Sequence, residues 1–145
     1  MEDLQDFLKG KKYKKIKFMV LKTQHLLIKG KINGVKGNFI LDTGASNSCV
    51  GFESIEHFKL DAQFSETKAA GAGATGIETQ LAKNNEIQLG RWKNHKFHLI
   101  VFDMSHVNDA LLHYKTKPVD GIIGADVLLK GKAIIDYSNH YLYLK

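Results

Sequence analysis

The segment Phe39-Ile40-Leu41-Asp42-Thr43-Gly44-Ala45-Ser46 carries the strongest structural and chemical signal in the chain. Its three leading apolar residues predict a buried strand, and a strand end is a rigid place to hold the Asp42 carboxylate. Gly44 has no side chain, so its N–H group and an approaching substrate can come close to that carboxylate. The Thr43 hydroxyl can fix the loop by a hydrogen bond to a neighbour. An isolated Asp-Thr-Gly is also compatible with a plain turn after a strand, so its surroundings must decide.

The surrounding sequence has the short period of β-strands. Extended segments are predicted at 13–21 and 25–32, and Asn33-Gly34 predicts a type I′ hairpin turn into Val35–Leu41, because both turn positions need a positive φ. The pattern predicts a mostly β, barrel-like single domain with short helices. We describe residues 1–24 as an N-terminal extension with the first strand, and residues 25–145 as the domain proper. Further strands are predicted at 86–89, 92–102, 122–123, 133–136 and 141–144, and helices at 2–8 (with Leu4, Phe7 and Leu8 on one side), 54–60, 105–114 and 125–129.

Two more segments follow Asp42 in a fixed order. The first is the small, glycine-rich run Ala69–Gly76, and the second is Val119–Leu129, which contains Ile122-Ile123-Gly124 about eighty residues after Asp42. An Asp-Thr-Gly loop, a glycine-rich segment and an apolar-apolar-glycine segment leading into a helix resemble the retropepsins. These are single-domain aspartic proteases of retroviruses with bacterial and cellular relatives. The resemblance covers roughly residues 26–144.

The resemblance implies a role for each matching segment. Asp42 would be the catalytic carboxylate, with Thr43 and Gly44 completing its loop, and the glycine-rich run would form the tip of a flap over the substrate. Ile122-Ile123-Gly124 would brace the catalytic loop. In place of an arginine-containing viral sequence the chain has Ala125-Asp126, so its dimer contacts are expected to differ. Substrate contacts are expected from Ala45, Gly71, Ala72, Gly73, Ala74, Ile122 and Ile123.

Aspartic protease chemistry needs two carboxylates, one acting as base and one as acid. Two such groups about 3 Å apart share one proton because both cannot ionise together. The chain has a single Asp-Thr-Gly; Asp120, Asp126 and Asp136 lack the following residues. We therefore expect a homodimeric endopeptidase that hydrolyses peptides or proteins, with one aspartate from each subunit. The alternative is a catalytically silent module of the same fold that binds peptides or scaffolds a partner.

Composition places limits on other partners and on location. The chain carries 21 Lys and Arg against 15 Asp and Glu, a net charge of +6, with a lysine run between Lys9 and Lys17. Such a run is compatible with nucleic acid or an anionic membrane. No arginine or aromatic stacking pattern accompanies it, so we interpret it as protection of a solvated strand edge, with neither partner expected. The acidic first residues do not resemble a signal peptide, and we expect a cytoplasmic protein.

Other sites that the sequence suggests are weaker. Gly71 to Gly76 matches the dinucleotide fingerprint G-x-G-x-x-G, but no apolar strand precedes it and Arg91 stands where an acidic residue is needed. His95 and His98 have an odd spacing, which on a strand places them on opposite faces. Cys49 with His57 lacks an orienting group, and Ser46 and Ser48 lack the G-x-S-x-G elbow. We expect a buried Cys49 behind the Asp42 loop, no metal and no cofactor.

Overall fold

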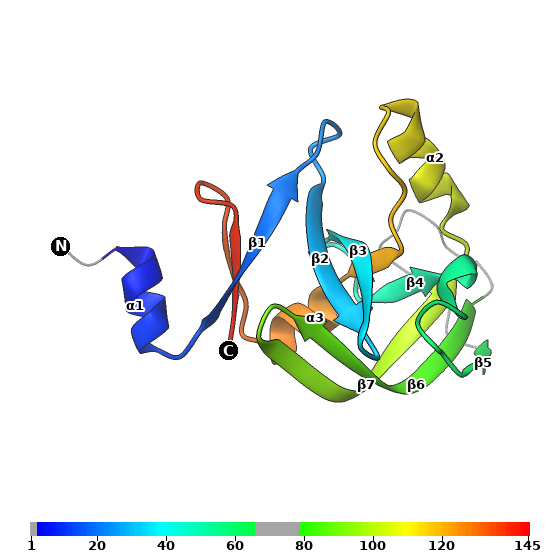
Figure 1. Cartoon of the computed structure of the whole chain (residues 1–145), viewed down its shortest axis with the longest axis horizontal. Coiled ribbons are helices and arrows are strands. Elements are labelled where there is room, and N and C mark those ends of the chain that lie inside the picture. The colour runs from blue at the N-terminus through cyan, green and yellow to red at the C-terminus, as the bar shows by residue number, and fades with distance from the viewer. Residues whose placement is uncertain (1–2, 66–78) are drawn as a thin grey trace.

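The computed structural model of the chain describes residues 3–65 and 79–145 (Figure 1). Ten strands form one sheet in the order β5-β6-β7-β4-β8-β3-β2-β1-β10-β9, and a further pairing between β6 and β2 closes six of them into a barrel. The strands are β1 (Lys14–Val20), β2 (Leu26–Ile32), β3 (Val35–Leu41), β4 (Cys49–Gly51), β5 (Ala62–Ser65), β6 (Thr79–Leu89), β7 (Trp92–Phe102), β8 (Gly121–Ile123), β9 (Ile134–Asp136) and β10 (Tyr141–Leu144). The helices are α1 (Leu4–Gly10), η1 (a 3₁₀ turn, Phe52–Ser54), α2 (Ser105–His113) and α3 (Ala125–Lys130). The predicted mostly β barrel with short helices is confirmed.

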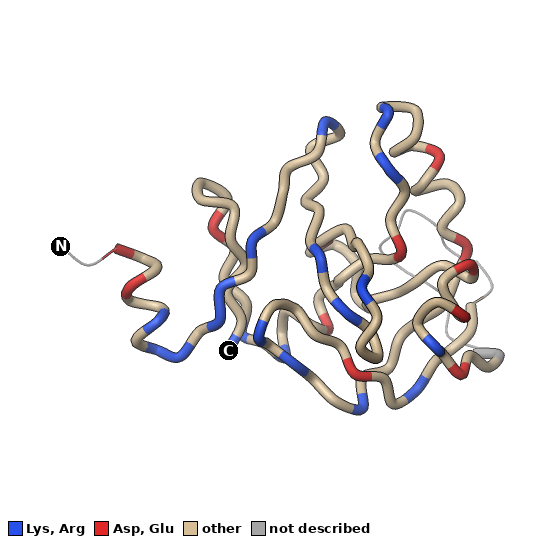
Figure 2. Tube along the Cα trace, viewed as in Figure 1, with Lys and Arg blue, Asp and Glu red and all other residues tan. Residues whose placement is uncertain are grey.

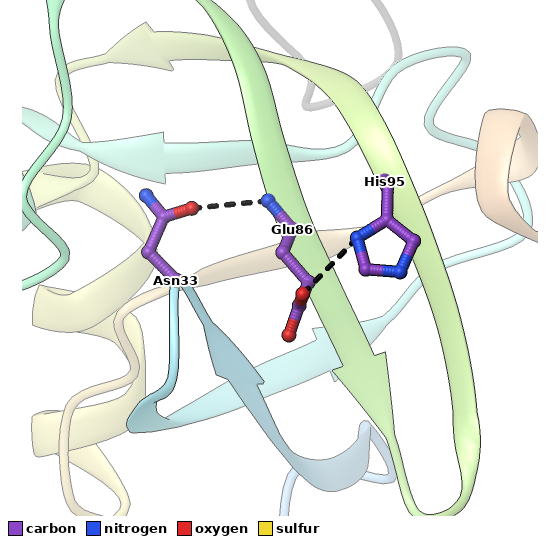
Figure 3. Close-up of polar contacts among 3 residues, drawn as sticks. All are labelled: Asn33, Glu86 and His95. Carbon is purple, nitrogen blue, oxygen red and sulfur yellow. Dashed lines mark hydrogen bonds and ion pairs between the residues drawn. The ribbon is translucent and has the colours of Figure 1, made fainter.

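The hairpin between β2 and β3 closes the barrel through its turn. Asn33 and Gly34 have φ values of 52° and 80°, as the predicted turn requires. The Asn33 amide donates to the carbonyl of Phe58 at 2.8 Å, and its carbonyl accepts the Glu86 N–H at 3.0 Å. Glu86 in turn contacts His95 Nδ1 of β7 at 3.1 Å (Figure 3). The turn residue therefore anchors the hairpin to β6, beside the Ile32–Ile87 pair that completes the ring.

Pairing between β3 and β8 places the two decisive sequence segments side by side. The strands are parallel, with Ile40 opposite Ile122 and Leu41 opposite Ile123. Because successive side chains of a strand point to opposite faces, Leu41 and Ile123 enter the larger apolar core, while Ile40 and Ile122 enter a smaller one. The Asp42 loop consequently starts between two apolar clusters and is fixed on both sides.

Some local features differ from the sequence predictions. β4 and β5 were not predicted, because strands of three or four residues are too short to show an alternating pattern. No α-helix forms over the predicted range 54–60. A 3₁₀ turn at Phe52–Ser54 precedes it, and hydrogen-bonded turns follow. In α1 only Leu8 is buried; Leu4 and Phe7 remain 44% and 49% exposed. That helix therefore covers the domain with one residue rather than with an apolar face.

The first strand changes partner along its length. Residues Lys14–Lys17 of β1 pair with β10 and Phe18–Val20 pair with β2, so each half of the strand is paired on one side. The interpretation of its lysines as edge protection stays a prediction. The chain's two end regions meet in one sheet, in which β9 is the outer strand, while the division at residue 24 stays a prediction. None of the helices in the described part of the chain is long and apolar enough to cross a membrane.

Candidate active site

Asp42 lies directly after β3, and its backbone is fixed before its side chain is considered. Its N–H donates to the carbonyl of Ile123 at 2.9 Å, and its own carbonyl accepts the N–H of Ala45 at 3.2 Å. The carboxylate is half-buried, and Oδ1 accepts the N–H of Gly44 at 2.8 Å. A Cβ at position 44 would lie 3.2 Å from the same oxygen, so glycine permits this close approach. The loop therefore presents one carboxylate in a defined orientation.

A second layer of residues holds the loop from behind. The Ser48 hydroxyl accepts the N–H of Gly124 at 2.8 Å and donates to Asp126 Oδ1 at 2.6 Å. Asp126 Oδ2 accepts the Ser48 N–H at 2.8 Å, while the N–H of Ala125 donates to the carbonyl of Ala45 at 2.7 Å. Sequence reasoning missed the Ser48–Asp126 pair. The only available signal was that Asp126 stands in the first turn of α3, where an acidic residue also favours the helix end.

Beside Asp42 lies a cavity of about 330 Å³. Its walls are mainly apolar, with Ile40 and Ile122 from the barrel and Val107 and Leu111 from α2. Two histidines, His25 and His106, also line it. A mostly apolar hollow with a few polar groups beside a carboxylate has the character of a site for a substrate side chain.

Cys49 is buried close to the Asp42 loop, as the sequence predicted. Its side chain is 5% exposed and its thiol is free. Burial, with the nearby negative charges of Asp126 and Asp42, raises the pKa of the thiol to about 12. A thiol that does not ionise near neutral pH is not a nucleophile, so the interpretation as a packing residue is supported.

The expected site residues occupy different positions. Thr43 and Gly44 are exposed beside Asp42, and Ile122 lines the cavity. Ala45 and Ile123 are buried, and support the loop through backbone hydrogen bonds rather than lining the cavity. The expected flap residues Gly71, Ala72, Gly73 and Ala74 lie outside the described residues, as does the G-x-G-x-x-G match.

The histidines considered as alternative sites have separate partners. His95 contacts Glu86, His98 Nδ1 accepts the N–H of Asn84 at 3.3 Å, and His57 Nε2 donates to the carbonyl of Lys36 at 2.8 Å. His95 and His98 therefore do not form a shared metal site in the structure. His57 likewise does not pair with Cys49.

Comparison with known proteins decides the family. The sequence profile described as aspartyl protease matches residues 28–127, well over half of the chain. The chain belongs to the aspartyl protease family. Its matched region begins in β2 and ends in α3, so it includes both Asp42 and the Ile122-Ile123-Gly124 segment. No curated protein matches the chain with significance.

Solved structures show that this member of the aspartyl protease family has the retropepsin-like fold. A retropepsin-like aspartic protease from Rickettsia conorii is 18% identical with a TM-score of 0.62, covering 91% of this chain and 89% of that one. The retroviral protease-like domain of Ddi1 from Leishmania major is 20% identical with a TM-score of 0.57, covering 83% and 88%. EIAV protease, in complex with an inhibitor, is 21% identical with a TM-score of 0.58, covering 81% and 98%.

Proposed function

We propose that this protein is an aspartic endopeptidase whose active site forms between two copies of the chain. The proposal is carried by one observation: a half-buried Asp42 is fixed at a strand end beside a mostly apolar cavity, and none of the other described residues that line this cavity is a carboxylate. Membership of the aspartyl protease family supports peptide hydrolysis, and that chemistry needs an acid and a base.

The other carboxylates around the loop are already engaged within the described chain. Both oxygens of Asp126 are hydrogen-bonded, to Ser48 and to the N–H of Val127. Asp120 Oδ2 accepts the N–H of Asn38 at 2.9 Å. A second copy of Asp42, related by a twofold axis, would supply the missing group.

In the proposed dimer the two Asp42 carboxylates hold one proton between them and a water molecule against both. One carboxylate takes a proton from the water as it attacks the peptide carbonyl, and the other protonates the carbonyl oxygen. Gly44 keeps each carboxylate oriented through its N–H. The Thr43 hydroxyl, which is exposed and makes no hydrogen bond among the described residues, is free to bond to the partner subunit.

The deciding experiment compares wild type with Asp42→Asn on a proteome-derived peptide mixture at mildly acidic pH, with pepstatin as a control. Asparagine has nearly the same shape but can neither hold nor release the proton. We expect a folded variant without cleavage. Cleavage by Asp42→Asn at the wild-type rate would reject the proposed role of Asp42. Binding of peptides by both proteins without any cleavage would favour the silent peptide-binding module.

A further inference from the structure

The positive charge of this protein is concentrated in its first quarter. Residues 1–40 contain ten lysines and three acidic residues, whereas residues 41–145 contain eleven Lys and Arg and twelve acidic residues. Figure 2 shows most of these lysines along the end of α1, the first half of β1 and the β2–β3 hairpin, and one in the turn between β1 and β2; further basic residues lie at the β6–β7 turn. The cavities that these residues line show that segments far apart in the sequence contribute to one basic surface.

Two cavities form the concave part of this surface. One has a volume of about 720 Å³ and lies along the β2–β3 hairpin; the other has a volume of about 380 Å³ and lies between α1, β1 and the β6–β7 turn. Gly90 lines both, so the two are adjacent. Among the described residues, Asp120 is the only carboxylate lining either of them, and it accepts the N–H of Asn38. We call the pair the basic groove; its Lys and Arg residues are Lys9, Lys14, Lys15 and Arg91 in the smaller cavity and Lys29, Lys31 and Lys36 in the larger.

The arrangement of the lysines in the larger cavity destabilises the fold. Lys31 of β2 stands directly opposite Lys36 of β3, and Lys29 lies two residues from Lys31 on the same face. Like charges directly opposite each other in an antiparallel pair are destabilising. Within the described part of the chain, neither Lys31 nor Lys36 forms an ion pair with a carboxylate. Like charges held close together without an opposite charge nearby lower the stability of the fold. Such departures from the rules of stability are expected at functional sites.

We propose that the basic groove docks an acidic, extended segment of the protein substrate, away from the bond that is cleaved. The larger cavity runs along β3 between Lys36 and Asn38, about four to six residues before Asp42. At roughly 3.3 Å per residue this places it about 13–20 Å from the catalytic carboxylate along the strand. The substrate class is therefore proteins that carry an acidic stretch some residues from the cleavage site. This assignment of a substrate class rests on the proposed peptidase function, but the docking of an acidic segment itself requires no cleavage.

The groove suits carboxylates better than nucleic acid. Single-stranded nucleic acid binding uses free aromatic faces on which bases stack. Of the two tyrosines that line the smaller cavity, Tyr143 is only 2% exposed, and Lys145 Nζ lies 5.9 Å from the centre of the Tyr13 ring. The Tyr13 hydroxyl is also engaged, donating to the carbonyl of Lys132 at 2.9 Å. A membrane surface is disfavoured because the cationic side chains line hollows instead of one flat face.

Direct binding tests the groove separately from catalysis. The protein is Asp42→Asn, which removes any cleavage, and the probe is a fluorescent peptide in which glutamate alternates with glycine, followed by anisotropy at low and physiological salt. The same peptide with glutamine in place of glutamate is the control probe. We expect binding of the glutamate peptide that weakens as salt screens the charges, and much weaker binding of the glutamine peptide.

Charge-reversal variants locate the binding. Lys31→Glu with Lys36→Glu should weaken binding of the glutamate peptide about tenfold, because each reversal replaces an attraction by a repulsion. Lys83→Glu, the same change at an exposed lysine of β6 outside both cavities, should alter it less than about twofold. If the double variant does not fold, Lys36→Gln alone should weaken binding about threefold. Equal effects at positions 36 and 83, or no binding of the glutamate peptide, would overturn the proposal.

Two competing partners are outcomes of the same assay. Tighter binding of a poly-deoxythymidine strand than of the glutamate peptide, or of vesicles containing phosphatidylserine, would reject the acidic peptide as the partner. In the wild type, an acidic extension fused to a cleavable peptide should lower KM about tenfold with kcat unchanged, the pattern of binding equal in ground and transition states. Binding of the glutamate peptide without any cleavage of substrates would support the proposed docking site and reject the proposed peptidase function. Cleavage of substrates without binding of the glutamate peptide would support the peptidase function and reject the docking site.

Discussion

The Ser48 hydroxyl donates to Asp126 Oδ1 at 2.6 Å while accepting the N–H of Gly124, so one buried side chain joins the Asp42 loop to α3 and to the end of β8. We expect Ser48→Ala to lower the free energy of unfolding by about 1–3 kcal/mol, since it leaves a buried N–H and part of a carboxylate without a partner. Chemical denaturation measures the change. Ser46→Ala, at an exposed position two residues earlier, should change stability by less than about 0.5 kcal/mol. Equal losses in the two variants would contradict the bracing role.

Gly124 is required for a different reason. A Cβ there would lie 2.5 Å from the carbonyl oxygen of Ala45, which is backbone and has little freedom to move. We expect Gly124→Ala to cost about 1–3 kcal/mol of stability through this overlap and to displace the Asp42 loop. Gly10→Ala is the control, because a Cβ at position 10 meets nothing within 4 Å. A thermal unfolding midpoint of Gly124→Ala at or above that of Gly10→Ala would show that the loop adjusts without cost.

Cys49 should be chemically silent in the folded protein. Its pKa is raised from 9.0 to about 12, so near pH 8 the folded state holds about a thousandfold less thiolate than the unfolded chain. We expect iodoacetamide to react slowly with native protein and rapidly in denaturant. The raised pKa also means that this group's contribution to stability is present below about pH 9 and is lost as the pH rises toward 12. Rapid alkylation of native protein at pH 8 would show that the loop opens readily.

The start of α2 should respond to acid. Asp103 Oδ1 accepts the N–H of Ser105 at 2.8 Å, and hydrogen bonds from Ser105 lower the pKa of the Asp103 carboxyl. A lowered pKa in the folded state adds stability above the ordinary value of about 3.9, and that contribution is lost as the pH falls through the folded pKa. The stability difference between wild type and Asp103→Asn should therefore be larger at pH 6 than at pH 3. A difference that does not change with pH would exclude this contact as its source.

Activity should depend on the concentration of the protein. If the site needs one Asp42 from each of two subunits, specific activity falls on dilution and recovers when substrate is added, because a ligand that bridges both subunits favours the paired state. A tenfold excess of Asp42→Asn should lower wild-type activity roughly tenfold, since most wild-type subunits then occupy mixed pairs. Constant specific activity through dilution, with light scattering showing only monomer, would mean that the second acid lies within one chain.

Local sequence was sufficient for much of this fold. The Asn33-Gly34 turn, the limits of β3 and the position of α2 follow from φ preferences and from side-chain period, which act over a few residues. The Asp42 loop was recognisable for the same reason, because its strand, carboxylate and glycine are consecutive. The exposed sides of Leu4 and Phe7 were not predictable, since a helical pattern shows that residues share a face and not what covers it.

Tertiary structure alone decided which distant residues meet. Ser48 and Asp126 are 78 positions apart, and Asn33 reaches Glu86 across 53, so no local pattern records either contact. The register of β2 against β3 sets Lys31 opposite Lys36, while the closure of β6 on β2 brings Gly90 beside both cavities. The sequence by itself determined that a carboxylate stands at the end of an apolar strand. Strand pairing between distant segments determined what braces that carboxylate and where the unpaired lysines gather, because a one-residue change of register would turn each side chain to the other face.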